Sequence, residues 1–177
     1  STNGNNELES SSWRESQTED DVDLKTVYVI SNEAVTSRNT LFAAKPRFIL
    51  RCDSRFRAVS SYIDWESFID NTVHRISLRL DDGPKLTMYW NESTDGTSSF
   101  VPEKPFLSNN KRYAPSSYLG MKNTKARRMD LIMAIIRSKK LAISVEDYQG
   151  SSISATFELG DIRKAYARFR KRCTEGV

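Results

Sequence analysis

The sequence predicts an α+β domain: an antiparallel β-sheet or small β-sandwich covered by two helices, one of them C-terminal. Runs rich in β-branched and aromatic residues alternate with polar turns through most of the chain, as in antiparallel strands. Two later segments carry apolar residues at helical spacing instead. A chain of 177 residues, 38% of them hydrophobic, can bury the core of one such domain, so we expect a single folded unit.

The chain is expected to begin with a flexible acidic leader over residues 1–23, followed by a single β-rich domain over residues 24–177. The leader is rich in Ser, Asn, Thr and Glu. Residues 1–24 contain seven acids and one arginine, a net charge of −6, so the remainder carries +10 by difference from the total of +4. Trp13 is a candidate to dock on the domain, because a lone Trp in a polar leader is otherwise exposed apolar surface.

The first half of the sheet is predicted by local composition and turn residues. Residues 26–30, 47–52 and 58–63 are rich in branched and aromatic side chains, so each is expected to form a strand. Residues 73–90 form a predicted hairpin around an Asp-Asp-Gly-Pro turn, and a short strand is expected around 98–101.

The first strand of that hairpin has the clearest alternation in the chain. Ile76 and Leu78 fall on one face, whereas Arg75 and Arg79 fall on the other. This period of two predicts a strand with one buried face.

The second half combines a loop, two helices and another hairpin. Residues 102–126 contain three prolines and a cluster of lysines and arginines, so they are expected to form a basic loop insertion. Helical spacing predicts helices over 127–138 and from 162 to the C-terminal region. Between them, residues 141–145 and 153–159 are expected to pair as a hairpin.

The two cysteines, Cys52 and Cys173, are placed to favour a pair. Cys52 ends an apolar run, and Cys173 lies on the apolar face of the last predicted helix. A bridge would close a loop of roughly 120 residues and could stabilise the fold by up to about 4–5 kcal/mol. The alternative is two buried thiols in a cytosolic protein.

No segment approaches the roughly 18 apolar residues that a membrane span requires, so none is expected. The chain begins with Ser1, which leads us to expect that an N-terminal piece was removed, either by a signal peptidase or in the preparation of the protein.

Catalytic and cofactor motifs are not apparent, so we expect a protein that is not an enzyme and needs no cofactor or metal. The single histidine, His74, has no cysteine or carboxylate at metal-ligand spacing. The adjacent Asp81 and Asp82 precede Gly-Pro, where a turn requires such residues anyway. The sequence also contains neither a Cys-x-x-Cys motif nor a glycine-rich phosphate loop.

A basic cluster with tyrosines is the candidate partner-binding surface. Its residues are Lys111, Arg112, Tyr113, Tyr118, Lys122, Lys125, Arg127 and Arg128. Such a mixture of cations and rings suits nucleic acid or an acidic protein partner, although a solvated basic surface without a ligand is also common.

Several short motifs, taken in order, resemble the TagO/VasI family of periplasmic accessory proteins of type VI secretion systems. They are Phe-Ile-Leu-Arg-Cys at 48–52, Tyr-Ile-Asp-Trp at 62–65, Arg-Leu-Asp-Asp-Gly-Pro at 79–84, Trp90, Ser93, Asp95, Phe100, the strand 141–145, Tyr148, Ala-Thr-Phe-Glu-Leu-Gly at 155–160 and a final helix containing Cys173. The resemblance covers most of residues 46–173. The long basic loop and the acidic leader depart from the family pattern.

The resemblance implies an exported, periplasmic or secreted protein without enzymatic activity, which assists assembly of a bacterial envelope apparatus by binding a protein partner. It also implies that Cys52 and Cys173 pair. The alternative is a cytosolic or phage-encoded protein that binds nucleic acid or a host protein through its basic surface. A hydrolase acting on cell wall or lipid is a third hypothesis, which no pair of carboxylates in the sequence favours.

Overall fold

The computed structural model describes residues 12–55, 58–102 and 131–175, which form ten strands, one short 3-10 helix and two α-helices. The strands are β1 (Arg14–Asp20), β2 (Lys25–Glu33), β3 (Thr36–Arg38), β4 (Arg47–Asp53), β5 (Ala58–Asp64), β6 (His74–Leu80), β7 (Leu86–Glu92), β8 (Ser98–Phe100), β9 (Lys140–Glu146) and β10 (Ser152–Glu158). The helices are η1 (Leu41–Ala43), α2 (Leu131–Ile136) and α3 (Ile162–Glu175).

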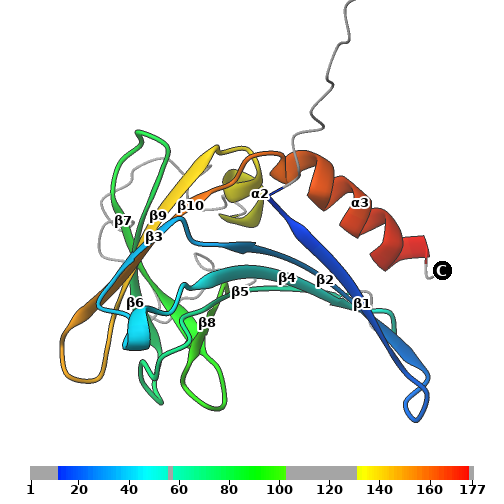
Figure 1. The fold of residues 1–177 in the computed structure, drawn as a ribbon, viewed down its shortest axis with the longest axis horizontal. Helices are drawn as coiled ribbons and strands as arrows, with labels where there is room; N and C mark the ends of the chain where they lie inside the picture. Colours follow the sequence, from blue (N-terminus) through cyan, green and yellow to red (C-terminus); the bar gives the residue numbers. More distant parts are fainter. Residues whose placement is uncertain (1–11, 56–57, 103–130, 176–177) are drawn as a thin grey trace, which may run out of the picture.

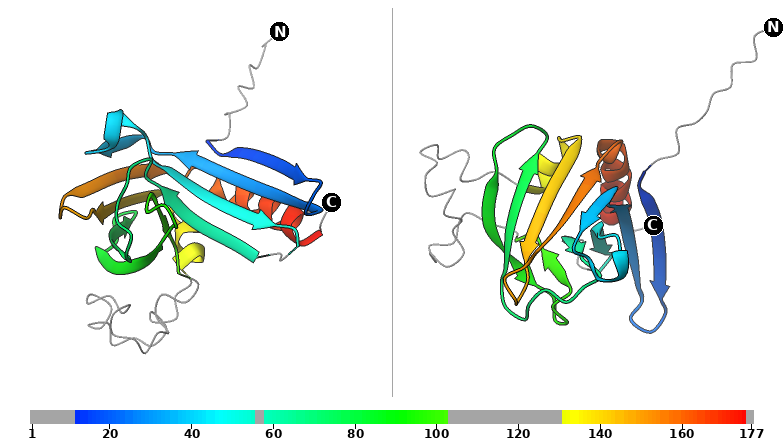
Figure 2. Two further views of the ribbon diagram at one scale, coloured as in Figure 1. Left: turned by 90° about the horizontal axis from the view of Figure 1, so that it is seen from below. Right: turned by 60° about the vertical axis from the view of Figure 1, so that its left-hand side comes forward.

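The ten strands belong to one curled sheet in the order β1-β2-β4-β5-β8-β7-β6-β9-β10-β3, and each neighbouring pair is antiparallel (Figure 1). The curl closes at the bend between β2 and β3. There the Ala34 N–H donates to the Pro46 carbonyl, and the next residue, Val35, donates to the Thr156 carbonyl. Two consecutive residues therefore bond to opposite halves of the sheet, which gives the sheet the form of a half-barrel (Figure 2).

The core lies inside this curl and is built by alternation along the strands. In β6, Ile76 and Leu78 are buried and Arg75 and Arg79 are exposed, as the sequence pattern predicts. The largest fully buried side chains are Trp65, Trp90, Phe48, Phe157 and Phe169. Exposed and buried residues thus alternate by strand geometry, and the outward residues of neighbouring strands share one surface.

The predicted fold class is confirmed in its main features. The structure is a mostly antiparallel sheet with a C-terminal helix. It is one continuous sheet, so the small sandwich considered beside it is not the form adopted. A cover of two helices is not confirmed, because α3 packs on β2 whereas the six-residue α2 contacts α3.

The predicted strands at 26–30, 47–52, 58–63, 98–101, 141–145 and 153–159 correspond to β2, β4, β5, β8, β9 and β10. The hairpin predicted over 73–90 is formed by β6 and β7. Its turn is held by Asp81, whose carboxylate accepts the N–H groups of Lys139 and Lys140 at 2.9 Å each. The adjacent aspartates therefore serve the turn, and one of them ties the hairpin to the start of β9.

The expectation that residues 1–23 form a flexible leader is wrong for residues 14–20. Arg14–Asp20 forms β1, which pairs with β2 along its whole length. Trp13 is buried, packs edge-on against Phe48 and donates its indole N–H to the Leu159 carbonyl at 2.8 Å. Trp13 therefore docks in the core eleven residues before the start of the domain expected from composition.

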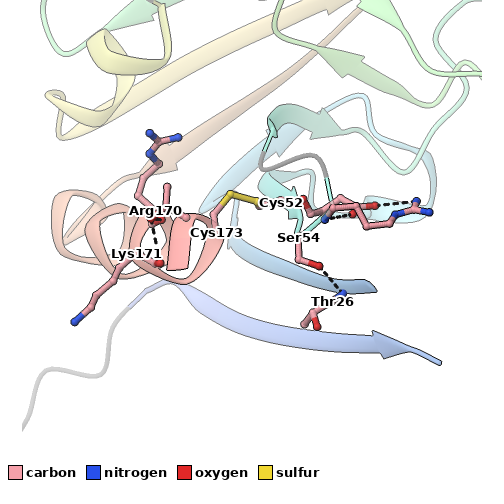
Figure 3. Close-up of a disulfide and its surroundings, with 9 residues drawn as sticks. Thr26, Cys52, Ser54, Arg170, Lys171 and Cys173 are labelled. Atoms are coloured by element: carbon pink, nitrogen blue, oxygen red, sulfur yellow. Dashed lines mark hydrogen bonds and ion pairs between the residues drawn. A yellow bond between two sulfur atoms is a disulfide. The ribbon is translucent and has the colours of Figure 1, made fainter. Parts of the chain in front are cut away.

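Helix α3 is fastened to the sheet by its apolar face and by a disulfide (Figure 3). Ile162, Ala165, Phe169 and Cys173 are buried, as the helical spacing predicts. The sulfur of Cys173 is bonded to that of Cys52 in β4, with the two Cα atoms 5.9 Å apart. The Cys52–Cys173 pairing is confirmed.

Candidate binding groove

A groove crosses the outer face of β6, β9, β10 and β3, and strand register explains its composition. Ser77 lies opposite Ser144, Ser144 opposite Ser154, and Ser154 opposite Arg38. Since directly paired residues of antiparallel strands point to the same face, these four side chains form one row across four strands. Small hydroxyl residues thus make a low floor that ends at an arginine.

A second row lies beside the first. Arg79 is paired with Ala142, Ala142 with Thr156, and Thr156 with Thr36. Ala142 adds no bulk in the middle of this row, whereas Arg79 is long and stands at its edge. The two rows therefore form a shallow depression with taller cationic residues on its margins.

The resulting hollow has a volume of about 380 Å³. Its lining residues are Thr36, Ser37, Arg38, Ser77, Leu78, Arg79, Lys85, Ala142, Ile143, Ser144, Ser154, Ala155 and Thr156. This lining contains three cationic side chains, six hydroxyl groups and no acid. We refer to it below as the groove.

The cations of the groove are not neutralised by the protein itself. Within the residues that the structure describes, neither Arg38, Arg79 nor Lys85 makes an ion pair with an acid. In the adjacent row, by contrast, Arg75 pairs with Glu146 at 3.6 Å. The positive charge over the groove is therefore not neutralised, whereas that of Arg75 in the adjacent row is.

Two of the six hydroxyl groups of the groove are already hydrogen-bonded, and within the described residues the other four are available as donors and acceptors. Ser77 exchanges a hydrogen bond with Thr87 at 3.2 Å, and Ser37 donates to the Ala44 carbonyl at 3.3 Å. Ser144 and Ser154 make no side-chain hydrogen bond within the described parts of the chain. Hydroxyl donors beside arginine and lysine suit the oxygens of carboxylates.

His74 has a structural role in the core. It is fully buried, and its Nε2 lies 2.9 Å from the Asp70 carbonyl, which can only accept, so Nε2 carries the proton. Its Nδ1 then accepts from the Ser99 hydroxyl at 2.6 Å, and Ser99 accepts the indole N–H of Trp65 at 2.9 Å. Both ring nitrogens are occupied and out of reach of a substrate.

The basic cluster predicted as the partner-binding surface lies outside the described residues. This applies to Lys111, Arg112, Tyr113, Tyr118, Lys122, Lys125, Arg127 and Arg128. The groove was not foreseen, because its cations and hydroxyl residues are distributed over several strands between residues 36 and 156. Only the strand register brings them together.

Two searches of the described residues bear on other kinds of site. Within residues 12–55, 58–102 and 131–175, no three side chains of His, Cys, Asp or Glu gather where they could hold a metal ion. No helix in those same segments is long and apolar enough to cross a membrane.

Comparison of the chain with protein-family models, curated proteins and solved structures found no match.

Proposed function

We propose that the protein is a non-enzymatic binding module that holds an acidic segment of a protein partner in the groove, and that it works in the assembly of a bacterial envelope apparatus of the type VI secretion kind. The observation that carries the proposal is the groove itself: three cations that no acid of the described residues pairs with, beside a hydroxyl floor. A surface of this kind attracts carboxylates and orients them through several donors.

The lining favours an acidic protein segment over nucleic acid. None of the residues that line the groove is aromatic, so bases would have no ring on which to stack. Extended acidic side chains, in contrast, reach both the hydroxyls of the floor and the cations of the margin.

The disulfide supports the envelope setting. Disulfides persist in oxidising compartments such as the periplasm and are rare in the cytosol, so the Cys52–Cys173 bond is compatible with an extracytoplasmic protein. The resemblance to the TagO/VasI family supports the same setting and a role as an accessory of assembly.

The test is direct binding of a fluorescent polyglutamate peptide, followed by anisotropy at low and at physiological salt. The variant Arg38→Gln/Arg79→Gln/Lys85→Gln should weaken binding by about 3- to 150-fold, since each exposed ion pair contributes about 0.2–1 kcal/mol and three are removed. Binding by the unmodified protein should fall as salt rises, because exposed charge pairs are screened.

A matched control removes three other exposed cations, through Arg170→Gln/Lys171→Gln/Arg172→Gln on α3. This variant should bind polyglutamate like the unmodified protein. Equal binding by the groove variant and the unmodified protein would remove the groove from consideration. Duplex DNA that binds more tightly than polyglutamate, and whose binding is lost in the groove variant but not in the α3 control, would instead assign the groove to nucleic acid.

A further inference from the structure

Apart from Val35, which is 49% exposed, the exposed large hydrophobic side chains of the described residues lie in two separate places. One is the turn between β1 and β2, where Val22 is 92% and Leu24 84% exposed. The other comprises Leu41, Phe42 and Tyr148, together with the partly exposed Phe68. Single exposed hydrophobics are ordinary, but a group of them that the core does not use indicates a contact surface.

The second group, called here the apolar end, is gathered from three segments. The Leu41 N–H donates to the Ser67 hydroxyl at 3.1 Å, which brings η1 to the residue before Phe68. The rings of Phe68 and Tyr148 are 5.4 Å apart, and the Tyr148 N–H donates to the Ile69 carbonyl at 2.8 Å. Leu41, Phe42, Phe68 and Tyr148 therefore form one surface.

The backbone at the apolar end is held in an unfavourable conformation. Phe42 has φ of 53° and Ala43 has φ of 54°, in the left-handed region that costs a side-chain-bearing residue about 1–2 kcal/mol. Phe42 is nevertheless 93% exposed, so burial of its own ring does not offset this cost. Strain of this kind is typical of sites that contact a ligand or partner.

The apolar end adjoins the groove. Arg38 is the last residue of β3 and a groove cation, and only two residues separate it from Leu41. One of these, Asn39, donates its side-chain amide to the Ser152 carbonyl at 2.9 Å, which fixes the connection against β10. A partner that fills the groove would thus meet cations first and apolar side chains at the end.

The β1–β2 turn has the complementary chemistry. Residues 19–24, called here the acidic finger, contain Glu19, Asp20, Asp21 and Asp23 around Val22 and Leu24. The turn is rigidly organised, since the carboxylate of Asp20 accepts the N–H groups of Val22 and Asp23 at 3.0 Å each. One positive charge is close by, because Lys25 pairs with Asp23 at 3.5 Å.

The acidic finger projects from the body of the molecule at the side opposite η1 and the β9–β10 turn (Figures 1 and 2). A molecule therefore cannot place its own finger against its own apolar end without rebuilding β1 and β2. The two surfaces are, however, arranged so that one copy can offer its finger to the next.

We infer that copies of this chain associate head to tail, with the acidic finger of one copy seated in the groove of the next and Val22 and Leu24 against the apolar end. The inference rests on the proposed function, since it names a second copy of the chain as the acidic segment that the groove holds. Four acids meet three cations that make no ion pair in the described part of the chain, and apolar side chains meet apolar side chains. A contact between two different surfaces joins copies head to tail, so it produces open chains, or rings where the rotation between copies closes.

The test is sedimentation velocity over a concentration series, with one variant at each surface. Val22→Ser/Leu24→Ser changes only exposed side chains of the finger, and Arg79→Glu/Lys85→Glu changes only exposed side chains of the groove. The unmodified protein should show a sedimentation coefficient that rises with concentration above the value of a monomer. Each variant alone should stay monomeric.

An equimolar mixture of the two variants decides the geometry. The Val22→Ser/Leu24→Ser protein still has an intact groove, and the Arg79→Glu/Lys85→Glu protein still has an intact finger. The mixture should therefore form one-to-one dimers and nothing larger. A mixture that remains monomeric, or a finger variant that associates like the unmodified protein, overturns the inference. An unmodified protein that is monomeric at about 1 mM overturns it as well.

Failure of the inference and failure of the proposed function can be distinguished with the polyglutamate peptide. If the groove binds this peptide while the unmodified protein remains monomeric, the proposed function stands and the second copy is the wrong occupant. If the peptide does not bind, the proposed function fails, and self-association that the Arg79→Glu/Lys85→Glu variant retains overturns the inference as well. The α3 control variant should associate like the unmodified protein, and any loss of association in it would assign the effect to net charge and overturn the inference.

Discussion

At the scale of single residues, Asp95 shows how one exposed carboxylate organises a turn between two strands. Its Oδ1 accepts the hydroxyls of Ser93 and Thr97 at 2.7 and 2.8 Å and the Thr97 N–H at 3.2 Å. The hydrogen bond from Ser93, followed by those from Thr97, lowers the pKa of Asp95 below its ordinary value of 3.8. The ionised form is therefore favoured by the folded state.

This shift predicts how stability depends on pH. A carboxyl whose pKa is lower in the folded state stabilises the fold above its unfolded pKa, and the contribution is lost as the pH falls through the folded pKa. Asp95→Asn should therefore make the fall of the unfolding free energy less steep below about pH 4. Urea denaturation at successive pH values measures it.

The control is Asp21→Asn, at an exposed carboxylate that accepts no hydrogen bond within the described residues. It measures what the removal of one exposed negative charge does to the stability profile on its own. Equal slopes for the Asp95 variant and the unmodified protein would contradict the role given to Asp95.

At the scale of elements, β1 is the strand that amino-acid composition does not predict. Its seven residues are Arg, Glu, Ser, Gln, Thr, Glu and Asp, and six of them are exposed, so no alternation of apolar residues is available to predict a strand. The strand forms because it pairs with β2 and because Trp13, directly before it, is anchored in the core. A tertiary anchor here overrides local preference.

Trp13→Ala tests whether β1 belongs to the fold. It should lower the unfolding free energy by about 3–5 kcal/mol, the usual cost of removing a buried aromatic ring. Trp13→Phe keeps a ring against Phe48 but loses the hydrogen bond to the Leu159 carbonyl, so it should cost only about 1–2 kcal/mol. Denaturant unfolding measures both losses. An unchanged stability for Trp13→Ala would favour the expectation that residues 1–23 are a flexible leader.

The same comparison explains how far the sequence predicts this molecule. The strands β6, β7, β9 and β10 are predictable because one face of each is buried and the apolar period is two. Strand β4 is predictable instead from its content of branched and aromatic residues. The three-residue β3 is too short to show a period. The periodicity of the sequence does not reveal the order of the strands in the sheet. The groove depends on this order, because it exists only where β3 lies beside β10.

At the scale of the whole molecule, one covalent bond joins distant parts of the chain. Cys52 in β4 and Cys173 in the last turns of α3 are 121 residues apart in sequence. In the unfolded chain this bond closes a long loop, so its main effect is to limit the conformations that unfolding releases.

Cys52→Ala/Cys173→Ala should therefore lower the unfolding free energy by about 3–5 kcal/mol. Guanidinium denaturation of the variant, and of the unmodified protein with and without reductant, measures this loss. Unchanged stability on reduction would show that packing of α3 alone fastens the helix.

Alkylation and intact mass of the denatured, unreduced protein from its native compartment should find no free thiol. Two thiols that react at once would place the chain in a reducing compartment and remove the main support for the envelope setting.

The position of this bond also means that it can form only after α3, near residue 173, has been delivered. In a chain that enters an oxidising compartment with its N-terminus first, Cys52 arrives long before Cys173 and stays a single thiol until α3 has followed. During that interval it is open to mixed disulfides with other thiols. Oxidation within the chain therefore reports that α3 has been delivered, and a chain arrested before that point would be recognisable by its reactive thiol.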